Sequence, residues 1–284
     1  MQKSSKKMVP SGSGAARKNI TQPRKPTAKP AIASVQTLAR KRGRPSRAGM
    51  PASDSATVLT REQILERATL LAKVEPLGDI SMVGLARELG VTPTLIHYYI
   101  GSRDDLISGV ANRYFKERLS RLQPLTGDWK EDLWREAQQS FKIGVEYGGV
   151  LRYMMSHNRF RLFQQISAGE IDYGMLYLDR MAGIFRGGGF TPRHAAIGYH
   201  LLSQYVMASS YAEVSRQLPA FHEHYIRGHI ESQPVARLGG AHYFAEAFST
   251  LSSATSFPEG LRLLIDSFES WLGEAAGTVR KRRK

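Results

Sequence analysis

The sequence predicts an all-α protein in which a three-helix unit precedes a larger helical bundle. Apolar residues recur at helical spacing from residue 60 to about residue 275, and no segment alternates with period two over the length of a strand. Pro, Gly and Ser or Thr residues stand where this pattern starts and stops, as they do at helix ends. The chain of 284 residues can hold one large domain or two small ones.

The first two helices are short and have recognisable ends. Thr60 is expected to cap the first helix, with Gln63 completing a capping box, and the Pro- and Gly-containing segment 75–79 ends it. Ser81 is expected to cap the second helix. Gly90 ends this helix after about two turns, as a glycine just beyond a helix end does.

A third short helix and a longer fourth one follow directly. Thr92 and Pro93 begin the third helix, because Pro is favoured at the first helical position. Gly101 ends it after "PTLIHYYI". Ser102 then caps a helix over residues 103–122, which carries acidic residues in its first turn, where the helix dipole favours them.

Helical patterning continues through the rest of the chain, with residues 217–240 left ambiguous by their Pro and Gly content. The Gly pair 148–149 is expected to interrupt a helix, and the Gly run 187–189 to end one. Further helices are predicted over residues 128–147, 150–157, 168–186, 192–216, 241–251 and 258–274.

The net charge of +15 is concentrated in the tails. Residues 1–59 hold 13 Lys or Arg and one acid, and the last five residues are all basic. The region between them is near neutral, with 22 basic and 24 acidic residues. Basic tails of this kind usually meet nucleic acid or an anionic membrane.

Four segments are therefore expected. Residues 1–58 are rich in Ser, Pro, Ala, Gly and Lys, so they cannot bury enough apolar surface to offset the entropy of ordering. We predict a disordered basic extension at 1–58, a helix-turn-helix DNA-binding domain at 59–110, a helical domain at 111–276 and a basic tail at 277–284.

Two short helices joined by a turn at Gly90 form a helix-turn-helix, whose second helix would enter the major groove of DNA. This helix offers hydroxyls, a proline ring and polar aromatic tips, and Arg103 follows it in position for a phosphate. The alternative is an ordinary capped helical hairpin, which is common in all-α proteins.

Residues 64–110, "ILERATLLAKVEPLGDISMVGLARELGVTPTLIHYYIGSRDDLISGV", resemble the DNA-binding domain of the TetR family of bacterial transcriptional repressors. Ser81, Ala86 and the turn 89–91 carry the resemblance. His97 and Ile100 depart from the family's usual Tyr and Phe. By carry-over, the base-reading candidates are Thr92, Pro93, Thr94 and His97, and the candidates for other DNA contacts are Ser81, Tyr98, Tyr99 and Arg103.

A second resemblance lies in the basic extension, at residues 40–47. Its core of Arg42, Gly43, Arg44 and Pro45 resembles an AT-hook. Gly43 lets the backbone approach a narrow groove, and both arginines suit the negative potential of an A·T-rich minor groove. The alternative is a tail that binds phosphates without reading sequence.

The TetR resemblance implies that the remaining helices bind a ligand and form a homodimer through the last two long helices. Candidate interface residues, which an ordinary core would explain equally well, are Leu201, Tyr205, Leu261, Leu264, Ile265, Phe268 and Leu272. Soft and aromatic residues suit an adaptable apolar pocket, although they are also typical of plain core. The pocket candidates are Met154, Met155, Phe163, Tyr173, Tyr177, Met181, Phe185, His200 and Gln204.

Several other functions are not expected. The chain has no cysteine and no apolar run that could span a membrane, and its basic N-terminus lacks the apolar core of a secretory signal. His222, His224 and His229 suggest a metal site only weakly, because no acidic ligand is fixed beside them. No enzyme motif is present, so neither enzymatic activity nor a cofactor is predicted.

The sequence thus predicts a cytoplasmic regulator that lies on the bacterial nucleoid when it is bound to DNA. We expect a homodimer on a palindromic operator, acting as a repressor that a small hydrophobic or amphipathic effector releases. Activation instead of repression stays open. A nucleoid-type architectural protein that binds DNA through its tails alone is the main alternative.

Overall fold

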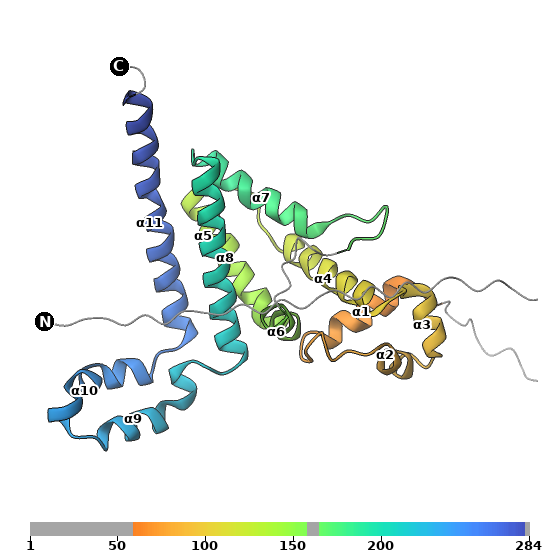
Figure 1. Cartoon of the computed structure of the whole chain (residues 1–284), viewed down its shortest axis with the longest axis horizontal. Helices are drawn as coiled ribbons and strands as arrows, with labels where there is room; N and C mark the ends of the chain where they lie inside the picture. Colours follow the sequence, from red (N-terminus) through yellow and green to blue (C-terminus); the bar gives the residue numbers. More distant parts are fainter. Residues whose placement is uncertain (1–58, 158–164, 282–284) are drawn as a thin grey trace, which may run out of the picture. The chain divides into compact units, whose positions relative to one another are not determined.

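The computed structural model describes residues 59–157 and 165–281, and from Gly273 onward it describes the backbone only. All regular elements in these two ranges are helices, as the sequence predicts (Figure 1). The expected basic extension with its AT-hook-like core, together with Phe163, lies outside the described residues.

The helix-turn-helix unit contains α1 (Arg61–Leu71), α2 (Met82–Glu88) and α3 (Pro93–Ile100). The predicted capping box of α1 is confirmed, because the Thr60 and Gln63 side chains each bond the other's backbone N–H. The turn between α2 and α3 depends on Gly90, whose φ of +66° lies in the left-handed region that other residues adopt only with strain.

Three helices then connect this unit to the bundle: α4 (Arg103–Ser120), α5 (Trp129–Glu146) and α6 (Gly148–Ser156). Ser102 caps α4 as expected and also forms a capping box with Asp105, and Asp128 accepts from the first turn of α5. The predicted interruption at the Gly pair 148–149 is wrong in detail, because these glycines form the first turn of α6.

The bundle is completed by α7 (Tyr173–Gly187), α8 (Pro192–Val214) and α11 (Ser253–Lys281). α8 contacts α5, α7 and α11. The expected start of α7 at residue 168 is wrong: Asp172 caps the helix by accepting from the Met175 N–H at 2.9 Å. The expected start of α11 at Pro258 is also too late, since Pro258 lies within its second turn.

The ambiguous segment 217–240 is mostly helical. It holds the short 3-10 helix η2 (Pro219–His222), α9 (Glu223–Glu231) and the start of α10 (Val235–Ser249). α10 is kinked at Leu238, whose backbone is non-helical, directly before two glycines. The sequence is ambiguous here because the glycines that normally end a helix lie inside a kinked one.

One hydrophobic cluster joins the helix-turn-helix unit to the bundle. Ile64 of α1, Phe115 of α4, Phe185 of α7 and Phe268 of α11 are each at most 1% exposed and all belong to it. Burying one such side chain contributes roughly 1.5–3 kcal/mol. A continuous core therefore gives a physical connection between the two ends of the described chain.

The start of α6 lies so close to the turn after α1 that the two backbones form hydrogen bonds with each other. Leu77 N–H donates to Gly149 O at 3.1 Å, and Val150 N–H donates to Ala72 O at 3.2 Å. A Cβ atom on Gly149 would lie 1.8 Å from Glu75 O, which no real structure tolerates. Glycine at position 149 is thus required by this close approach.

Candidate DNA-binding surface and ligand cavity

Helix α3 has one buried side and one exposed side. Ile96 and Ile100 are 0% and 5% exposed and attach the helix to the core. Thr92, Pro93 and Thr94 are all exposed at the N-terminal end, where a recognition helix meets base edges. The position of the helix is therefore fixed by apolar contacts, while its polar end stays open to a partner.

The two capping positions of the helix-turn-helix differ in how they use their hydroxyls. Ser81 Oγ accepts from the Gly84 N–H at 2.9 Å and so caps α2, as predicted. Thr92 occupies the N-cap position of α3 with an extended backbone, but its side chain makes no capping hydrogen bond. The Thr92 hydroxyl is consequently available for a base or a phosphate.

His97 and the two tyrosines are arranged at the other end of α3. His97 Nδ1 lies 3.1 Å from Gly101 O, so the ring is held against the helix end. Tyr98 is 79% exposed, whereas Tyr99 is half-buried against the core, and their rings meet edge to face at 5.1 Å. Tyr98 can thus reach outward from a support that Tyr99 provides.

Basic side chains flank this surface. Arg103 is exposed in the first turn of α4, close in sequence to the end of α3. Arg87 is exposed near the end of α2, while Arg67 is paired with Glu88 at 2.5 Å. Arg87 and Arg103 suit contacts with phosphates, which position a protein on DNA without reading its sequence.

A cavity of about 80 Å³ lies between α4, α5, α6, α7 and α8. Most of its wall is apolar, and hydroxyl groups supply most of the remainder. Of the predicted pocket residues, the structure brings Met154, Tyr177 and Met181 together in this wall.

The other described pocket candidates lie elsewhere. His200 lines a separate, wider groove of about 570 Å³ between α7 and α8. Phe185 is fully buried in the core, and Met155 is 40% exposed. Tyr173 and Gln204 line neither the cavity nor the groove. Tyr199 and Ser203 line both, so these two residues separate the cavity from the groove.

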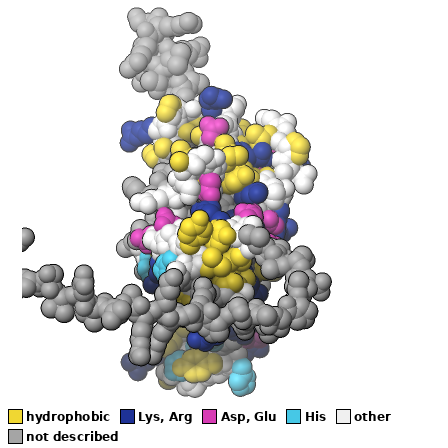
Figure 2. All heavy atoms as spheres, turned by 90° about the vertical axis from the view of Figure 1, so that its right-hand side faces the viewer, with side chains coloured by type: hydrophobic (Ala, Val, Ile, Leu, Met, Phe, Trp, Pro, Cys, Tyr) yellow, Lys and Arg dark blue, Asp and Glu magenta, His cyan; other side chains and the backbone are white. Residues whose placement is uncertain are grey.

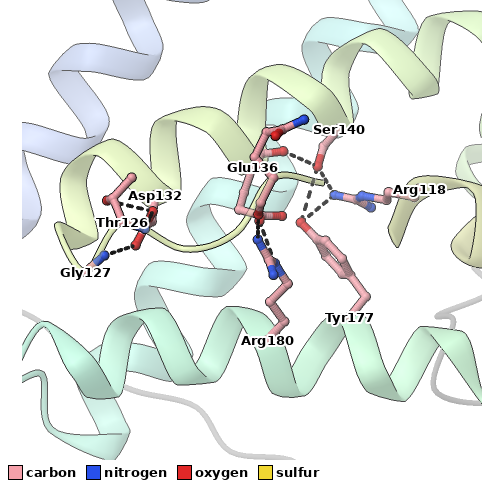
Figure 3. A network of polar contacts seen from close by, with 9 residues as sticks. Arg118, Thr126, Gly127, Asp132, Glu136, Ser140, Tyr177 and Arg180 are labelled. Atoms are coloured by element: carbon pink, nitrogen blue, oxygen red, sulfur yellow. Dashed lines mark hydrogen bonds and ion pairs between the residues drawn. The ribbon is translucent and has the colours of Figure 1, made fainter. Parts of the chain in front are cut away.

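Arg118 is the charged residue of the cavity wall, and the sequence analysis did not predict it. Its Nη2 donates to Tyr177 OH at 2.7 Å and also bonds Ser140 Oγ (Figure 3). Its guanidinium carbon lies 3.8 Å from the centre of the Tyr177 ring. Arg118 follows Tyr114 by one helical turn, so a basic residue on the apolar side of α4 was the available signal.

A buried ion pair lies beside this group. Glu136 on α5 is 2% exposed, and its Oε1 accepts from Arg180 Nε at 2.7 Å (Figure 3). Burial raises the pKa of the Glu136 carboxyl above its ordinary value, and the hydrogen bond from Arg180 offsets only part of this rise. Glu136 is therefore committed to Arg180, which also donates to Gln123 O at 2.5 Å.

Comparison with known proteins identifies this arrangement of helices. No family model and no curated protein matches the sequence. The apo structure of ActR from Streptomyces coelicolor is 24% identical with a TM-score of 0.64, covering 76% of this chain and 98% of that one. SCO7222, a TetR from the same organism, is 12% identical with a TM-score of 0.61, covering 75% and 99%. BioQ from Mycobacterium smegmatis is 16% identical with a TM-score of 0.53, covering 75% and 98%.

The described part of the chain has the TetR fold. The likeness spans the helix-turn-helix unit and the bundle, so the fold predicted from residues 64–110 is confirmed well beyond that segment. At 24% and 12% identity, these likenesses concern the fold of the described residues.

The predicted interface residues of the TetR fold face different ways. Leu261, Ile265 and Phe268 are at most 3% exposed within a single chain, so they have no surface to offer a partner. The Tyr205 hydroxyl donates to Ser256 O and Phe257 O, each at 3.0 Å, and thereby joins α8 to α11. Leu264 and Leu272 are half-buried against the same core, and Leu201 is 39% exposed.

Other apolar side chains are exposed on α8 and α11. Ile197 is 37% exposed one turn before Leu201, and Leu263 is 74% exposed. Figure 2 shows the side that lies on the right in Figure 1, and there hydrophobic side chains lie among Lys, Arg, Asp and Glu side chains. The exposed residues of α8 and α11, rather than their buried stripes, are thus the surface that a second subunit can reach.

The histidine-rich segment forms helices and turns. His222 Nε2 lies 2.9 Å from Arg216 O, and the His229 ring stacks on Tyr225. In the described ranges, no three His, Asp or Glu residues are grouped so that they could hold a metal ion. Within the same ranges, no helix is long and apolar enough to cross a membrane.

Proposed function

We propose that this protein is a ligand-responsive transcriptional regulator, a repressor that binds a palindromic operator as a homodimer. The observation that carries the proposal is a helix-turn-helix with an open polar face, built on the same core as a bundle that contains a cavity. Solved structures of the same fold include ActR in complex with actinorhodin and with (S)-DNPA. These complexes support the proposal that this chain responds to a small-molecule effector.

DNA recognition is assigned to the exposed side of α3. Thr92, Pro93, Thr94 and His97 read base edges in the major groove, and Tyr98 and Arg103 contact the backbone of the DNA. Tyr99 supports Tyr98 from its half-buried position. Ser81 keeps its capping bond to Gly84 and donates its own proton to a phosphate.

Two connections carry the effector signal to α3. α4 runs from Arg103, beside α3, to Arg118 in the cavity wall, a distance of about 22 Å at 1.5 Å per residue. The second connection is the backbone contact between α6 and the turn after α1. Because packed helices shift as units, widening the cavity displaces both connections.

The described conformation is assigned to the effector-free form. Pockets for drug-sized ligands usually measure about 300–1,000 Å³, several times more than this cavity. A small hydrophobic or amphipathic effector must therefore open the bundle to enter. The effector acts as a switch only to the extent that it binds the opened form more tightly than the closed one.

The homodimer forms through the exposed side chains of α8 and α11. Two recognition helices then reach successive major grooves, which are about 34–36 Å apart. We assign residues 40–47 to the minor groove beside the operator, where Arg42 and Arg44 read A·T-rich flanks. About 15 residues separate this segment from α1, and they span up to about 50 Å when extended.

The test is selection of bound fragments from genomic DNA by the full-length protein, followed by footprinting. A discrete palindrome is expected, with A·T-rich flanks whose preference disappears when Arg42 and Arg44 are both changed to Ala. The double change also reduces the salt dependence of binding, because it removes phosphate contacts.

Three other outcomes are informative. Smooth coverage of A·T tracts identifies an architectural protein that binds through its tails. An asymmetric footprint contradicts the homodimer. Flank preference that survives the double change shows that residues 40–47 contribute charge alone.

A further inference from the structure

We infer that the effector is an anion: an aromatic molecule with a carboxylate or phenolate oxygen that pairs with Arg118. This inference rests on the proposed function, because it names the chemistry of the effector. The observation behind it is a cation in the wall of an otherwise neutral cavity. Among the residues that line the cavity, Arg118 alone carries a full charge.

The charge of Arg118 is offset only through space, by the nearby Glu136 carboxylate, and not by a direct ion pair. No described carboxylate forms an ion pair with Arg118. Glu136 is paired with Arg180, and Glu117 and Glu146 are paired with Arg121. Arg118 Nε is buried and has no hydrogen-bond partner among the described residues. A partly buried guanidinium without a directly paired counter-ion is costly, so an anion that binds it would stabilise it.

The neighbours of Arg118 hold it in place without neutralising it. Ser140 and Tyr177 accept from one end of the guanidinium, and the face of the Tyr177 ring lies against its plane. An aromatic face stabilises a cation but does not remove its charge. The Nε and Nη1 donors remain, and each can form a charge-assisted hydrogen bond with an anionic oxygen.

The rest of the cavity fits the aromatic part of such a molecule. Phe115, Met154, Met181 and Leu202 supply apolar wall, and methionine side chains adapt to a ligand of irregular outline. Tyr199 and Ser203 stand between the cavity and the outer groove, so movement of these residues joins the two spaces. Room for a bicyclic ligand can thus arise without unfolding the core.

The experiment compares 2-naphthoate with 2-naphthylmethanol, which share a bicyclic ring and differ in the anionic group. Binding to the full-length protein is measured by calorimetry in the absence of DNA. The unaltered protein is expected to bind the carboxylate about tenfold to a hundredfold more tightly than the alcohol, as for a charge-assisted bond. Arg118→Met removes this preference, and Arg118→Lys keeps part of it.

Arg135→Met is the matched control, because Arg135 is exposed on α5 and lies outside the cavity. This control removes the same charge, so it reports general attraction of anions to a basic protein. The preference for the carboxylate must survive in this variant. The circular dichroism spectrum shows whether each variant is folded. If Arg118→Met does not fold, the preference of Arg118→Lys for the carboxylate is the result that tests the inference.

Equal binding of the two probes, binding of neither, or a preference that persists in Arg118→Met overturns the inference. None of these results bears on the operator footprint, so the proposed function as a transcriptional regulator would not be affected. Conversely, an Arg118-dependent preference in a protein without a discrete footprint would establish the anion site and remove the proposed function.

Discussion

Single side chains decide whether a polar group serves the fold or a partner. Thr60 and Thr92 both occupy N-cap positions with extended backbone, yet only Thr60 bonds the first turn of its helix. The same residue type is thus a structural cap at one site and an unused hydroxyl at the other. This difference gives a direct test of the recognition surface.

The change Thr60→Ala should lower the free energy of unfolding by about 1 kcal/mol, because it removes a cap. The matched change Thr92→Ala should leave that free energy within about 0.5 kcal/mol and weaken operator binding by roughly threefold to tenfold, the effect of one hydrogen bond. Chemical denaturation and fluorescence anisotropy measure the two quantities. A Thr92→Ala protein with unaltered operator affinity would remove Thr92 from the recognition surface.

Glu146 lies at the end of α5, and its carboxylate forms ion pairs with Lys73 and Arg121. The hydrogen bond from Arg121, followed by that from Lys73, lowers the pKa of its carboxyl from 4.5 to about 2. A lowered pKa in the folded state stabilises the fold above the ordinary pKa, and this stabilisation disappears as the pH falls through the lowered value. The group is about one-third exposed, which reduces its contribution to about 1 kcal/mol.

We therefore expect Glu146→Gln to be less stable than the unaltered protein at neutral pH. The gap between the two proteins should close between about pH 5 and pH 2, where Glu146 becomes protonated. Urea unfolding at several pH values measures this gap. A gap that is independent of pH would show that the ion pairs with Lys73 and Arg121 do not stabilise the fold.

At the scale of elements, α6 and the turn after α1 are in direct backbone contact. Two backbone hydrogen bonds cross it, and the absence of a side chain at position 149 makes them possible. Arg152 adds a bond from α6 to Val74 O at 3.1 Å. Helix α6 is thereby attached to the DNA-binding unit by several independent bonds.

Gly149→Ala should lower the free energy of unfolding by about 1–3 kcal/mol, because the new methyl group would overlap Glu75 O. Gly183→Ala in α7 is the matched control, since no atom lies within 4 Å of its added Cβ. That control should be stabilised by up to about 1 kcal/mol through helix propensity. Thermal unfolding distinguishes the two, and a Gly149→Ala protein as stable as the control would contradict the close approach.

At the scale of the whole molecule, the proposed function requires two subunits to present their α3 helices together. Leu201→Glu places a charge on the exposed side of α8 and should convert the dimer to a monomer with weakened operator binding. Leu125→Glu is the control, because Leu125 is 44% exposed on the connection between α4 and α5. Light scattering measures the mass, and a dimeric Leu201→Glu protein would place the interface elsewhere.

Local chemistry explains which features the sequence could predict. The caps at Thr60, Ser81 and Ser102 bond backbone groups two or three residues away, so their effect is visible in the sequence alone. The turn at Gly90 is likewise local, because it depends on the conformation of one residue. These short-range signals predicted the helix-turn-helix and the all-α class.

Long-range packing decided the rest. Periodicity shows that Leu261 and Phe268 share a side of α11, but only the neighbouring helices determine that this side is filled within one chain. The same holds for Gly149, whose role depends on a turn over 70 residues earlier in the chain. Arg118 looks like an ordinary surface cation in the sequence, and it becomes a cavity residue only because α5 and α7 bring Ser140 and Tyr177 against it. The sequence by itself determined the helices and their ends, because those depend on neighbours along the chain. The tertiary structure decided the cavity, its charge and the surfaces left for a partner, because those depend on which helices meet.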